Sequence, residues 1–410
     1  MKIRIGGAFD LQPLRILFLF TAAFLVISPF IEQYKKDRGQ DIKIQTNYEK
    51  YLIAYILTAS AVYIYHFAGS DINKLILVLT TLPTFVLVYF MLKKTGDQGM
   101  KDAFKLSLIS VAVISSLVAI VQFVGDQSFF RVNPDYDRPA FAGLLRSTGV
   151  FRDDYLHSYV VFTALVWVAF SDFKTWKKNA LMGLFFLSIF LAFMRMGYVV
   201  AAIFAVHAVI YASNATFKLK VLVVTLAAIF GVFSIFAVIS SGILESSVAQ
   251  ERMMDEGTME LRFALFEKAI QVSFSDIQGL LLGYGGPESE VYYNAIFEVT
   301  GSQTWAMGNK GGWHNLFIEI MFYTGLPTLI LFAIFLVGIG KYYHRIAKST
   351  SHFEYYIPFY ITIGYFVANL TLGLGLETNF AIILSISAAI LINQRKTQLQ
   401  ETQVHDLTKV

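Results

Sequence analysis

Long apolar runs dominate the sequence, and the polar residues gather in the segments between them. The runs are continuous rather than alternating, and most approach the roughly 20 residues that a helix needs to cross a bilayer. Because only helices and closed barrels satisfy every backbone group in lipid, continuous runs indicate helices. Eleven runs are predicted to be spans: Leu14–Phe30, Leu52–Ala68, Leu75–Leu92, Phe104–Phe123, Tyr155–Phe170, Ala180–Met194, Gly197–Tyr211, Leu219–Ser240, Leu316–Gly340, Tyr356–Leu372 and Phe380–Ile392.

The composition also indicates a membrane protein. Hydrophobic residues make up 56% of the chain and charged residues 15%, whereas soluble domains carry about 25% charged residues. We therefore expect an all-α, polytopic helical membrane protein with about 11–12 transmembrane helices, and residues 1–410 as a single integral membrane domain. The net charge of +4 is spread over the loops, so no nucleic acid partner is expected. The absence of cysteine excludes disulfides and thiolate chemistry.

Lys and Arg predict the orientation, since they concentrate in cytoplasmic loops. Clusters such as Lys174–Lys178 and Lys341–Lys348 are therefore placed in the cytoplasm. The segment Gly125–Asp154 and the large loop 241–313 then face the opposite side, while the side of the N-terminus stays open. Within the large loop, apolar residues recur at helical spacing over Met259–Val272, which predicts an amphipathic helix lying against the membrane.

Three residues of this outward side are candidates for catalysis. Arg195 lies between two apolar runs, and a charge at membrane depth is costly enough to suggest a function, although it can also snorkel to the interface. Arg262 lies on the predicted amphipathic helix. The alternative is that it is a solvated charge on the surface of that helix. His314 immediately precedes an apolar run, beside Asn315, which can orient it. The ordinary histidine pKa of about 6.5 suits a general base, and the alternative is a structural histidine.

The loop before the fifth predicted span carries further arginines. The fork of Arg146 or Arg152 can grip phosphate oxygens, and the alternative is a solvated loop of mixed charge. The adjacent pair Asp153-Asp154 is too small a set of carboxylates to predict a metal site. The chain has no Gly-x-x-x-x-Gly-Lys-Ser/Thr motif, so nucleotide hydrolysis is not expected.

Several short motifs occur in a distinctive order between Arg146 and Pro327. They are Arg146-x-x-Gly149-x-Phe151, Arg195, Arg262, Leu282-Gly283-x-Gly285, His314-Asn315 and Gly325. In this order they resemble the motifs of the O-antigen ligase and O-antigen polymerase superfamily of integral membrane glycosyltransferases. The chain departs from that pattern at Asp153-Asp154, where the family often has Pro-Asn, and at Met194, where it often has serine.

The resemblance implies a metal-independent, inverting transfer of a glycan from undecaprenyl pyrophosphate, without a cofactor. It places the multi-pass enzyme in the bacterial inner membrane, with the active site and the large loop facing the periplasm. It implies catalytic roles for His314, Arg195 and Arg262. Substrate-binding roles fall to Arg146, Arg152, Asn315, Gly283 and Gly285. The expected partners are the lipid-linked glycan, a glycan or lipid acceptor, and other membrane proteins of polysaccharide assembly.

Three functions remain open at this point. A polymerase of O-antigen, capsule or exopolysaccharide repeat units is favoured, because the Arg-x-x-Gly-x-Phe motif resembles capsule and exopolysaccharide polymerases. An O-antigen ligase, which transfers the glycan to lipid A core, shares the same chemistry. A transporter or flippase predicts charges paired within the spans and often an internal repeat. The spans hold few ionisable groups besides Arg195 and no evident repeat, which disfavours the transporter.

Overall fold

A computed structural model describes part of the chain. The described residues are 3–5, 9–11, 49–67, 98–131, 139–141, 144–151, 154–192, 195–211, 256–286, 289–301, 313, 315–350, 354 and 356–370. Four predicted spans lie outside them: Leu14–Phe30, Leu75–Leu92, Leu219–Ser240 and Phe380–Ile392. Arg152 and His314 also lie outside the described residues.

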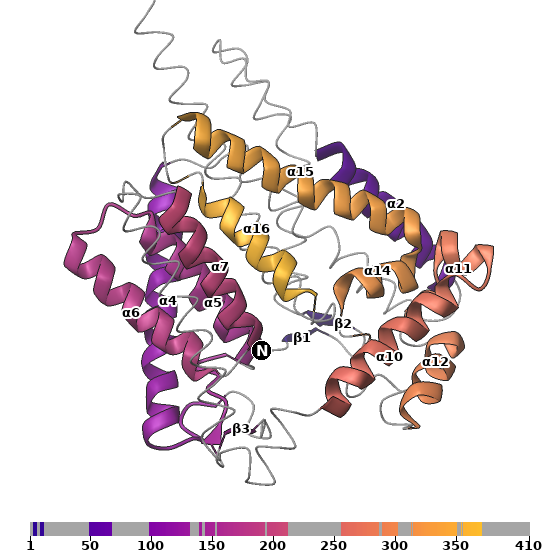
Figure 1. Ribbon diagram of the computed structural model, residues 1–410, viewed down its shortest axis with the longest axis horizontal. Helices are drawn as coiled ribbons and strands as arrows, with labels where there is room; N and C mark the ends of the chain where they lie inside the picture. Colours follow the sequence, from indigo (N-terminus) through magenta and orange to yellow (C-terminus); the bar gives the residue numbers. More distant parts are fainter. Residues whose placement is uncertain are drawn as a thin grey trace, which may run out of the picture. The chain divides into compact units, whose positions relative to one another are not determined.

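The described residues are mainly helical, which confirms the predicted helical class (Figure 1). The helices are α2 Glu49–Phe67, α4 Gln98–Val124, α5 Asp154–Ala169, α6 Thr175–Leu191, α7 Arg195–Tyr211, α10 Glu256–Ser273, α11 Ile277–Leu282, α12 Glu290–Thr300, α14 Leu316–Thr324, α15 Leu326–Thr350 and α16 Tyr356–Ala368. Two short antiparallel pairs accompany them: β1 Ile3–Ile5 with β2 Phe9–Leu11, and β3 Pro139–Phe141 with β4 Leu144–Leu145. These strands were not predicted, because two or three residues are too few to show an alternating pattern.

Six predicted spans coincide with single helices, namely α2, α4, α5, α6, α7 and α16. Among the described helices, two are long and apolar enough to cross a membrane. They are Lys101–Val124 within α4, with a mean hydropathy of 2.3, and Leu326–Arg345 within α15, with a mean hydropathy of 1.7.

The predicted span Leu316–Gly340 is wrong as a single helix, because the chain breaks at Gly325. Gly325 has a φ of +85°, a region that favours glycine. Its amide still donates to the Met321 carbonyl at 2.8 Å, which ends α14, and α15 starts at the next residue. Pro327 suits the first turn of α15, where its missing N–H leaves no hydrogen bond unmade. The nine residues of α14 reach only about 13 Å at 1.5 Å per residue, too short to cross a bilayer.

The chain divides into two compact units, and each is described by itself. Unit 1 comprises Met1–Asp102, Leu265–Tyr342 and Leu372–Val410. Unit 2 comprises Ala103–Ala264 and Tyr343–Thr371. The expectation of one integral membrane domain over residues 1–410 stays a prediction.

In unit 1, aromatic side chains join helices that are distant in sequence. Helix α2 lies along α15, with the rings of Tyr55 and Phe332 5.0 Å apart (Figure 1). The indole of Trp313 is fully buried, with its ring centre 5.5 Å from Tyr292 of α12 and 4.8 Å from Phe322 of α14. The residue that precedes His314 is therefore fixed in a packed aromatic core.

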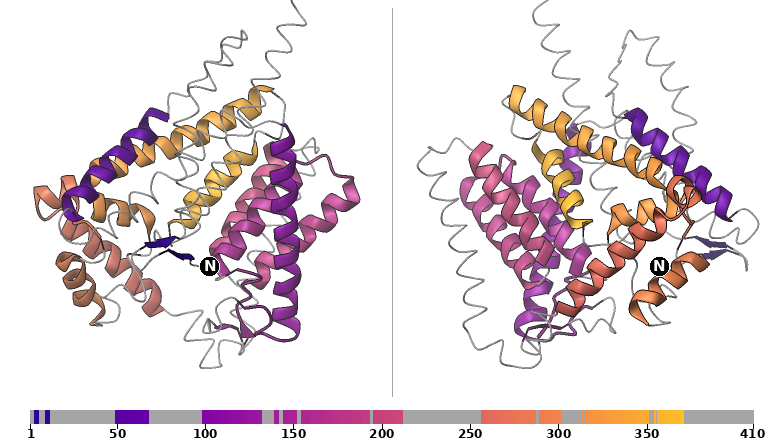
Figure 2. Two further views of the ribbon diagram at one scale, coloured as in Figure 1. Left: turned by 180° about the vertical axis from the view of Figure 1, so that it is seen from behind. Right: turned by 45° about the vertical axis from the view of Figure 1, so that its right-hand side comes forward.

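In unit 2, α5 is the central helix. It is apolar on nearly all sides, and the residues from His157 to Val168 are buried. A helix of this kind has to be covered all round, and α6, α7 and α16 contact it. Figure 2 shows α5 among its neighbours α4, α6 and α7. Packing is close, because a Cβ added at Gly364 of α16 would lie 2.6 Å from the Phe162 ring.

Helix α10 confirms the helix that was predicted at Met259–Val272. Leu265 and Ala269 form its covered face, each 0% exposed. Phe263 and Ile270, from the predicted apolar face, are 62% and 46% exposed. Phe263 and Ile270 therefore lie outside the covered face of α10, and contact of this helix with a membrane stays a prediction.

Candidate functional site

The best-defined part of the candidate site is the segment Arg146–Phe151, called here the Arg146 loop. Gly149 has a φ of +56°, a conformation that L side chains rarely adopt. A Cβ at this position would collide with the Ser115 hydroxyl and would lie 2.6 Å from Nδ1 of His157. The glycine of the Arg-x-x-Gly-x-Phe motif is therefore required by conformation and by close packing.

The backbone of this loop is hydrogen-bonded although it has no regular secondary structure. The amides of Thr148 and Gly149 both donate to Oε1 of Gln122 at 3.0 Å. The amide of Val150 donates to Oγ of Ser115 at 3.2 Å. Gln122 and Ser115 lie on α4, so this helix fixes the conformation of the loop.

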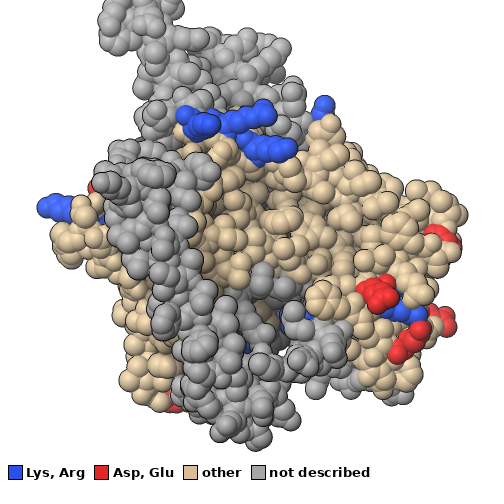
Figure 3. Space-filling model, in the orientation of Figure 1, with Lys and Arg blue, Asp and Glu red and all other residues tan. Residues whose placement is uncertain are grey.

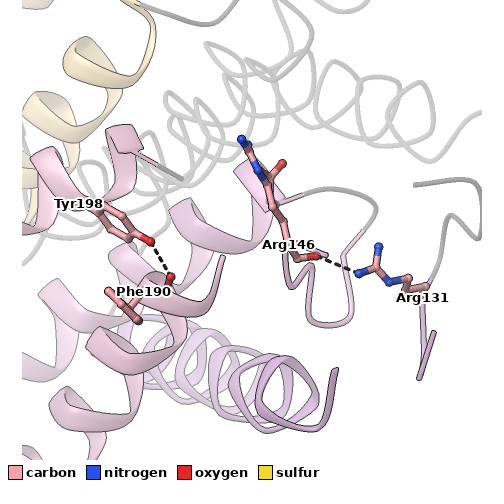
Figure 4. Close-up of polar contacts among 5 residues, drawn as sticks. Arg131, Arg146, Phe190 and Tyr198 are labelled. Carbon is pink, nitrogen blue, oxygen red and sulfur yellow. Dashed lines mark hydrogen bonds and ion pairs between the residues drawn. The ribbon is translucent and has the colours of Figure 1, made fainter. Parts of the chain in front are cut away.

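Arg146 is held from two directions. Its Nη1 lies 2.9 Å from Oδ2 of Asp154, the first residue of α5, whose side chain is fully buried. Its carbonyl accepts a hydrogen bond from Nη2 of Arg131 at 3.0 Å (Figure 4). The Nε of Arg146 is buried and has no hydrogen-bond partner among the described residues. A guanidinium fixed in this way can receive the oxygen of an anionic group such as a phosphate.

Asp154 has a structural role at one of the positions where the chain departs from the family pattern. Asp153-Asp154 stands where the family that the motifs resemble often has Pro-Asn. In this chain the second aspartate forms the ion pair with Arg146 and begins α5. A carboxylate at that position also interacts favourably with the N-terminal dipole of a helix.

Arg195 begins α7, directly after the break that separates α7 from α6. The expected pair of helices around this arginine is therefore present. Near the break, the hydroxyl of Tyr198 in α7 donates to the carbonyl of Phe190 in α6 at 2.7 Å (Figure 4). The bond ties together the two helices that flank Arg195. Its predicted catalytic role stays a prediction.

The glycines of the Leu-Gly-x-Gly motif pack a turn against the end of α14. Gly283 has a φ of +64°, and a Cβ there would lie 2.5 Å from the carbonyl carbon of Tyr323. The amide of Tyr284 donates to the Phe322 carbonyl at 2.8 Å, and that of Gly285 to the Tyr323 carbonyl at 3.0 Å. The structure gives both glycines a packing role, and substrate contact stays a prediction.

Tyr284 also ties this turn to the start of α11. Its hydroxyl lies 2.7 Å from Oδ2 of Asp276, the N-cap residue of α11. Oδ1 of Asp276 accepts from the Gly279 amide at 2.6 Å. The hydrogen bond from the Gly279 amide, followed by the hydrogen bond from the Tyr284 hydroxyl, lowers the pKa of the Asp276 carboxyl below its ordinary value. Asp276 is therefore ionised at neutral pH and holds the glycine turn in place.

Asn315 caps α14. Its Oδ1 accepts from the amides of Phe317 at 2.9 Å and Ile318 at 3.1 Å. Two otherwise unpaired amides of the first turn are thereby satisfied. Trp313 is fixed on the other side of His314 in the sequence, so both neighbours of His314 have defined positions. The expected role of Asn315 in orienting His314 stays a prediction.

The predicted residues divide between the two units. Arg146, Arg195 and Arg262 belong to unit 2, and Trp313 and Asn315, the described neighbours of His314, belong to unit 1 with the glycine turn. Arg262 lies on α10 and is partly exposed. A common site for these residues stays a prediction.

Two functional candidates were missed in the sequence. Glu319 is 3% exposed in the first turn of α14, inside a run predicted to be a span. An ionisable residue in such a run is a functional candidate by default. Gln122 is 1% exposed on α4, and its importance comes from partners that lie far along the chain. The signal in the sequence was a polar residue within a predicted span.

Comparison with known proteins gives no match: no protein-family model fits the chain, and no curated protein sequence is similar to it. The function has to be inferred from the residues and their geometry.

Proposed function

We propose that the protein is a membrane glycosyltransferase that polymerises undecaprenyl-pyrophosphate-linked oligosaccharide repeat units. The units belong to O-antigen, capsule or exopolysaccharide, and the reaction takes place at the periplasmic face of the bacterial inner membrane. One observation carries the proposal. Arg146 is fixed by Asp154 and Arg131 on an ordered loop, and its buried Nε has no partner among the described residues.

This geometry suits a phosphate ligand. Arginine presents several N–H groups in one plane, and phosphate oxygens accept them in pairs. In Arg146 the carboxylate of Asp154 occupies Nη1, which sets the direction of the remaining donors. A site prepared in this way spares the reorganisation that a mobile side chain would need on binding.

The proposed enzyme is polytopic, with about 11–12 spans and a large periplasmic loop at 241–313. Support comes from α4 and α15, which are long and apolar enough to cross a membrane. The exposed basic residues Lys341, Arg345 and Lys348 lie toward the C-terminal end of α15, and Figure 3 shows basic side chains gathered over one end of this helix. The glycine turn packs at Gly325, next to its other end. Because basic residues favour the cytoplasm, the turn is assigned to the periplasmic side.

In the proposed mechanism, a sugar hydroxyl attacks the anomeric carbon of the donor from the face opposite the pyrophosphate. The carbon–oxygen bond to the pyrophosphate breaks as the new glycosidic bond forms, so the configuration inverts. His314 accepts the proton of the attacking hydroxyl. Arg195 and Arg262 stabilise the negative charge that grows on the leaving undecaprenyl pyrophosphate. The charge compensation by the arginines needs no metal ion or cofactor.

A ligase that transfers the glycan to lipid A core or another acceptor would use the same chemistry and residues. A transporter or flippase is the candidate from another class, because Glu319 is a buried carboxylate in an apolar helix. Buried carboxylates of this kind occur in proton-coupled transporters. The two classes differ in the product, since only a transferase forms a new glycosidic bond.

The test uses the full-length protein, purified and reconstituted in liposomes with an undecaprenyl-pyrophosphate-linked oligosaccharide. Mass spectrometry would follow the glycan. Oligomers of the repeat unit, with release of undecaprenyl pyrophosphate, are expected for a polymerase. Transfer only to added lipid A core would identify a ligase. Movement of the intact donor across the bilayer without a new bond would contradict the proposal.

A further inference from the structure

The side chain of Gln122 is buried on α4, and all of its hydrogen bonds go to backbone groups. Its Oε1 accepts from the amides of Thr148 and Gly149, each at 3.0 Å. Its Nε2 donates to the carbonyls of Gly149 at 3.0 Å and Phe129 at 2.8 Å. A carboxamide has two donor hydrogens and two acceptor lone pairs. Gln122 uses all of them, so its position and that of the loop determine each other.

The bonds of Gln122 reach both sides of Arg146. On one side they fix Thr148 and Gly149, which follow Arg146 in the loop. On the other they fix the carbonyl of Phe129, in the turn that ends at Arg131. Arg131 donates to the carbonyl of Arg146 itself (Figure 4). Gln122 therefore bonds to the chain on both sides of Arg146, in addition to the bonds that Ser147 makes to the carbonyls of Leu191 and Ala119.

A second buried group supports the same loop. Oγ of Ser115 accepts from the amide of Val150 at 3.2 Å and lies 2.8 Å from Nδ1 of His157. Nε2 of His157 lies 2.9 Å from Oγ of Ser188 on α6. The hydrogen bonds among Ser115, His157 and Ser188 thus link α4, α5 and α6. All three side chains are at most 1% exposed, so water does not compete for these bonds.

We propose that Gln122, assisted by Ser115, is a positioning residue for donor binding and acts through Arg146. It holds the loop so that the Arg146 guanidinium meets a phosphate oxygen of the lipid-linked donor. The inference rests on the proposed function, because it takes the donor phosphate as the ligand of Arg146. A misplacement of about 1 Å in a positioned group can reduce activity on the order of a hundredfold. A residue that never touches the substrate therefore affects its binding.

A purely structural role for Gln122 gives a different expectation. If it only stabilises unit 2, its loss lowers the amount of folded protein and leaves the affinity of the folded molecules unchanged. If it acts through Arg146, its loss lowers the affinity only while Arg146 is present. The two roles are separated by a double-mutant cycle, because residues that act as one unit are not additive.

The experiment uses the full chain in lipid nanodiscs, with undecaprenyl pyrophosphate as the titrated probe. Gln122→Met keeps the length of the side chain and removes its four hydrogen bonds. Ser115→Ala is a second, milder variant. It removes another support of the same loop and tests the positioning role if Gln122→Met does not fold. Thr163→Val is the matched control, because Thr163 is buried in the same unit and its hydroxyl donates to the Tyr159 carbonyl within its own helix. Hydrogen exchange of the peptide 147–151 reports the loop separately from binding.

We expect Gln122→Met to weaken binding by about tenfold or more and to speed exchange in residues 147–151. Ser115→Ala should act in the same direction with a smaller effect, and Thr163→Val should leave the affinity unchanged. In an Arg146→Ala background, Gln122→Met should cause no further loss. Faster exchange with unchanged affinity, or an equal loss in both backgrounds, would overturn the positioning role. Unchanged affinity in Arg146→Ala alone would instead overturn the donor contact of the proposed function, and with it any role through Arg146.

Discussion

Arg146 and Asp154 form an ion pair of 2.9 Å in which the aspartate side chain is fully buried and the arginine side chain is 28% exposed. The pair occupies Nη1 of the fork, while Nε is buried and has no hydrogen-bond partner among the described residues. The arrangement suits a group that has to bind an anion in a fixed direction, because the carboxylate orients the fork without occupying all of its donors. The first prediction concerns the strength of this pair.

Arg146→Met should lower the free energy of unfolding by about 1–3 kcal/mol, since it leaves the Asp154 carboxylate buried without this cation. Adding Asp154→Leu to Arg146→Met should recover part of the lost stability. Replacing both partners of a buried ion pair by apolar residues costs less stability than removing one partner, which leaves the other charge buried and unpaired. Denaturant unfolding of the purified variants in detergent micelles would measure both effects. A double variant no more stable than Arg146→Met would show that the pair does not behave as a unit.

The second prediction concerns Gly149. Gly149→Ala should disrupt the Arg146 loop and abolish most transfer, because the added methyl meets Ser115 and His157 at a positive φ. Gly183→Ala is the matched control. A Cβ at Gly183 in α6 meets nothing within 4 Å, and alanine is the better helix former by roughly 0.5–1 kcal/mol. Glycan transfer and unfolding of both variants would be measured. Similar activity in the two variants would contradict the role of the loop.

The third prediction compares two glycines at positive φ. Gly283 and Gly301 have φ values of +64° and +61°, so alanine should be strained by about 1–2 kcal/mol at either site. Only Gly283 is also blocked by backbone atoms, whereas a Cβ at Gly301 meets nothing within 4 Å. Gly283→Ala should therefore lower the midpoint of thermal unfolding further than Gly301→Ala. Equal shifts would mean that the turn does not pack on α14 as described.

The helices could be predicted from the sequence because the long apolar runs are continuous rather than alternating. The break at Gly325 could not, since the residues from Leu316 to Gly340 are mainly apolar on both sides of it. Gly325 and Pro327 were the residues that could indicate a break. Their effect depends on the turn at Leu281, whose carbonyl lies against Gly325, and such a long-range contact leaves no periodic pattern.

The same reason limits the prediction of the site. Arg146 and Gly149 belong to a short motif, so the resemblance could identify them. Gln122 precedes Gly149 by 27 positions and is one of several polar residues on α4. Its partners are backbone atoms, which are the same for every sequence. The supports of the Arg146 loop therefore became visible only in the structure.

The fourth prediction concerns topology. Cysteine replacements can be labelled without background, because the chain has no cysteine. Glu290→Cys, at the exposed start of α12, should react with an impermeant thiol reagent from the periplasmic side. Lys348→Cys, at the basic end of α15, should react only after the inner membrane is permeabilised. The reverse labelling pattern would overturn the assigned orientation.

The fifth prediction concerns His314, the proposed general base. Loss of a general base typically lowers the rate by about 10²–10⁴. His314→Ala should therefore lose transfer while it retains the affinity for undecaprenyl pyrophosphate, which is assigned to the arginines. His352→Ala, in the segment between α15 and α16, is the control and should be active. Reduced protein levels with a normal rate per folded molecule would indicate a structural role for His314.

The most direct measurement is the rate of glycosidic bond formation by the purified full-length protein. The reaction contains an undecaprenyl-pyrophosphate-linked repeat unit and EDTA, and the rate is normalised to folded protein. We expect the wild type to form oligomers and to release one undecaprenyl pyrophosphate for each new bond, with His314→Ala slower by about 10²–10⁴. Equal turnover by His314→Ala would contradict its role as general base. Loss of wild-type turnover in EDTA would contradict a metal-independent reaction. The absence of any new glycosidic bond with folded wild-type protein would contradict the assignment as a glycosyltransferase.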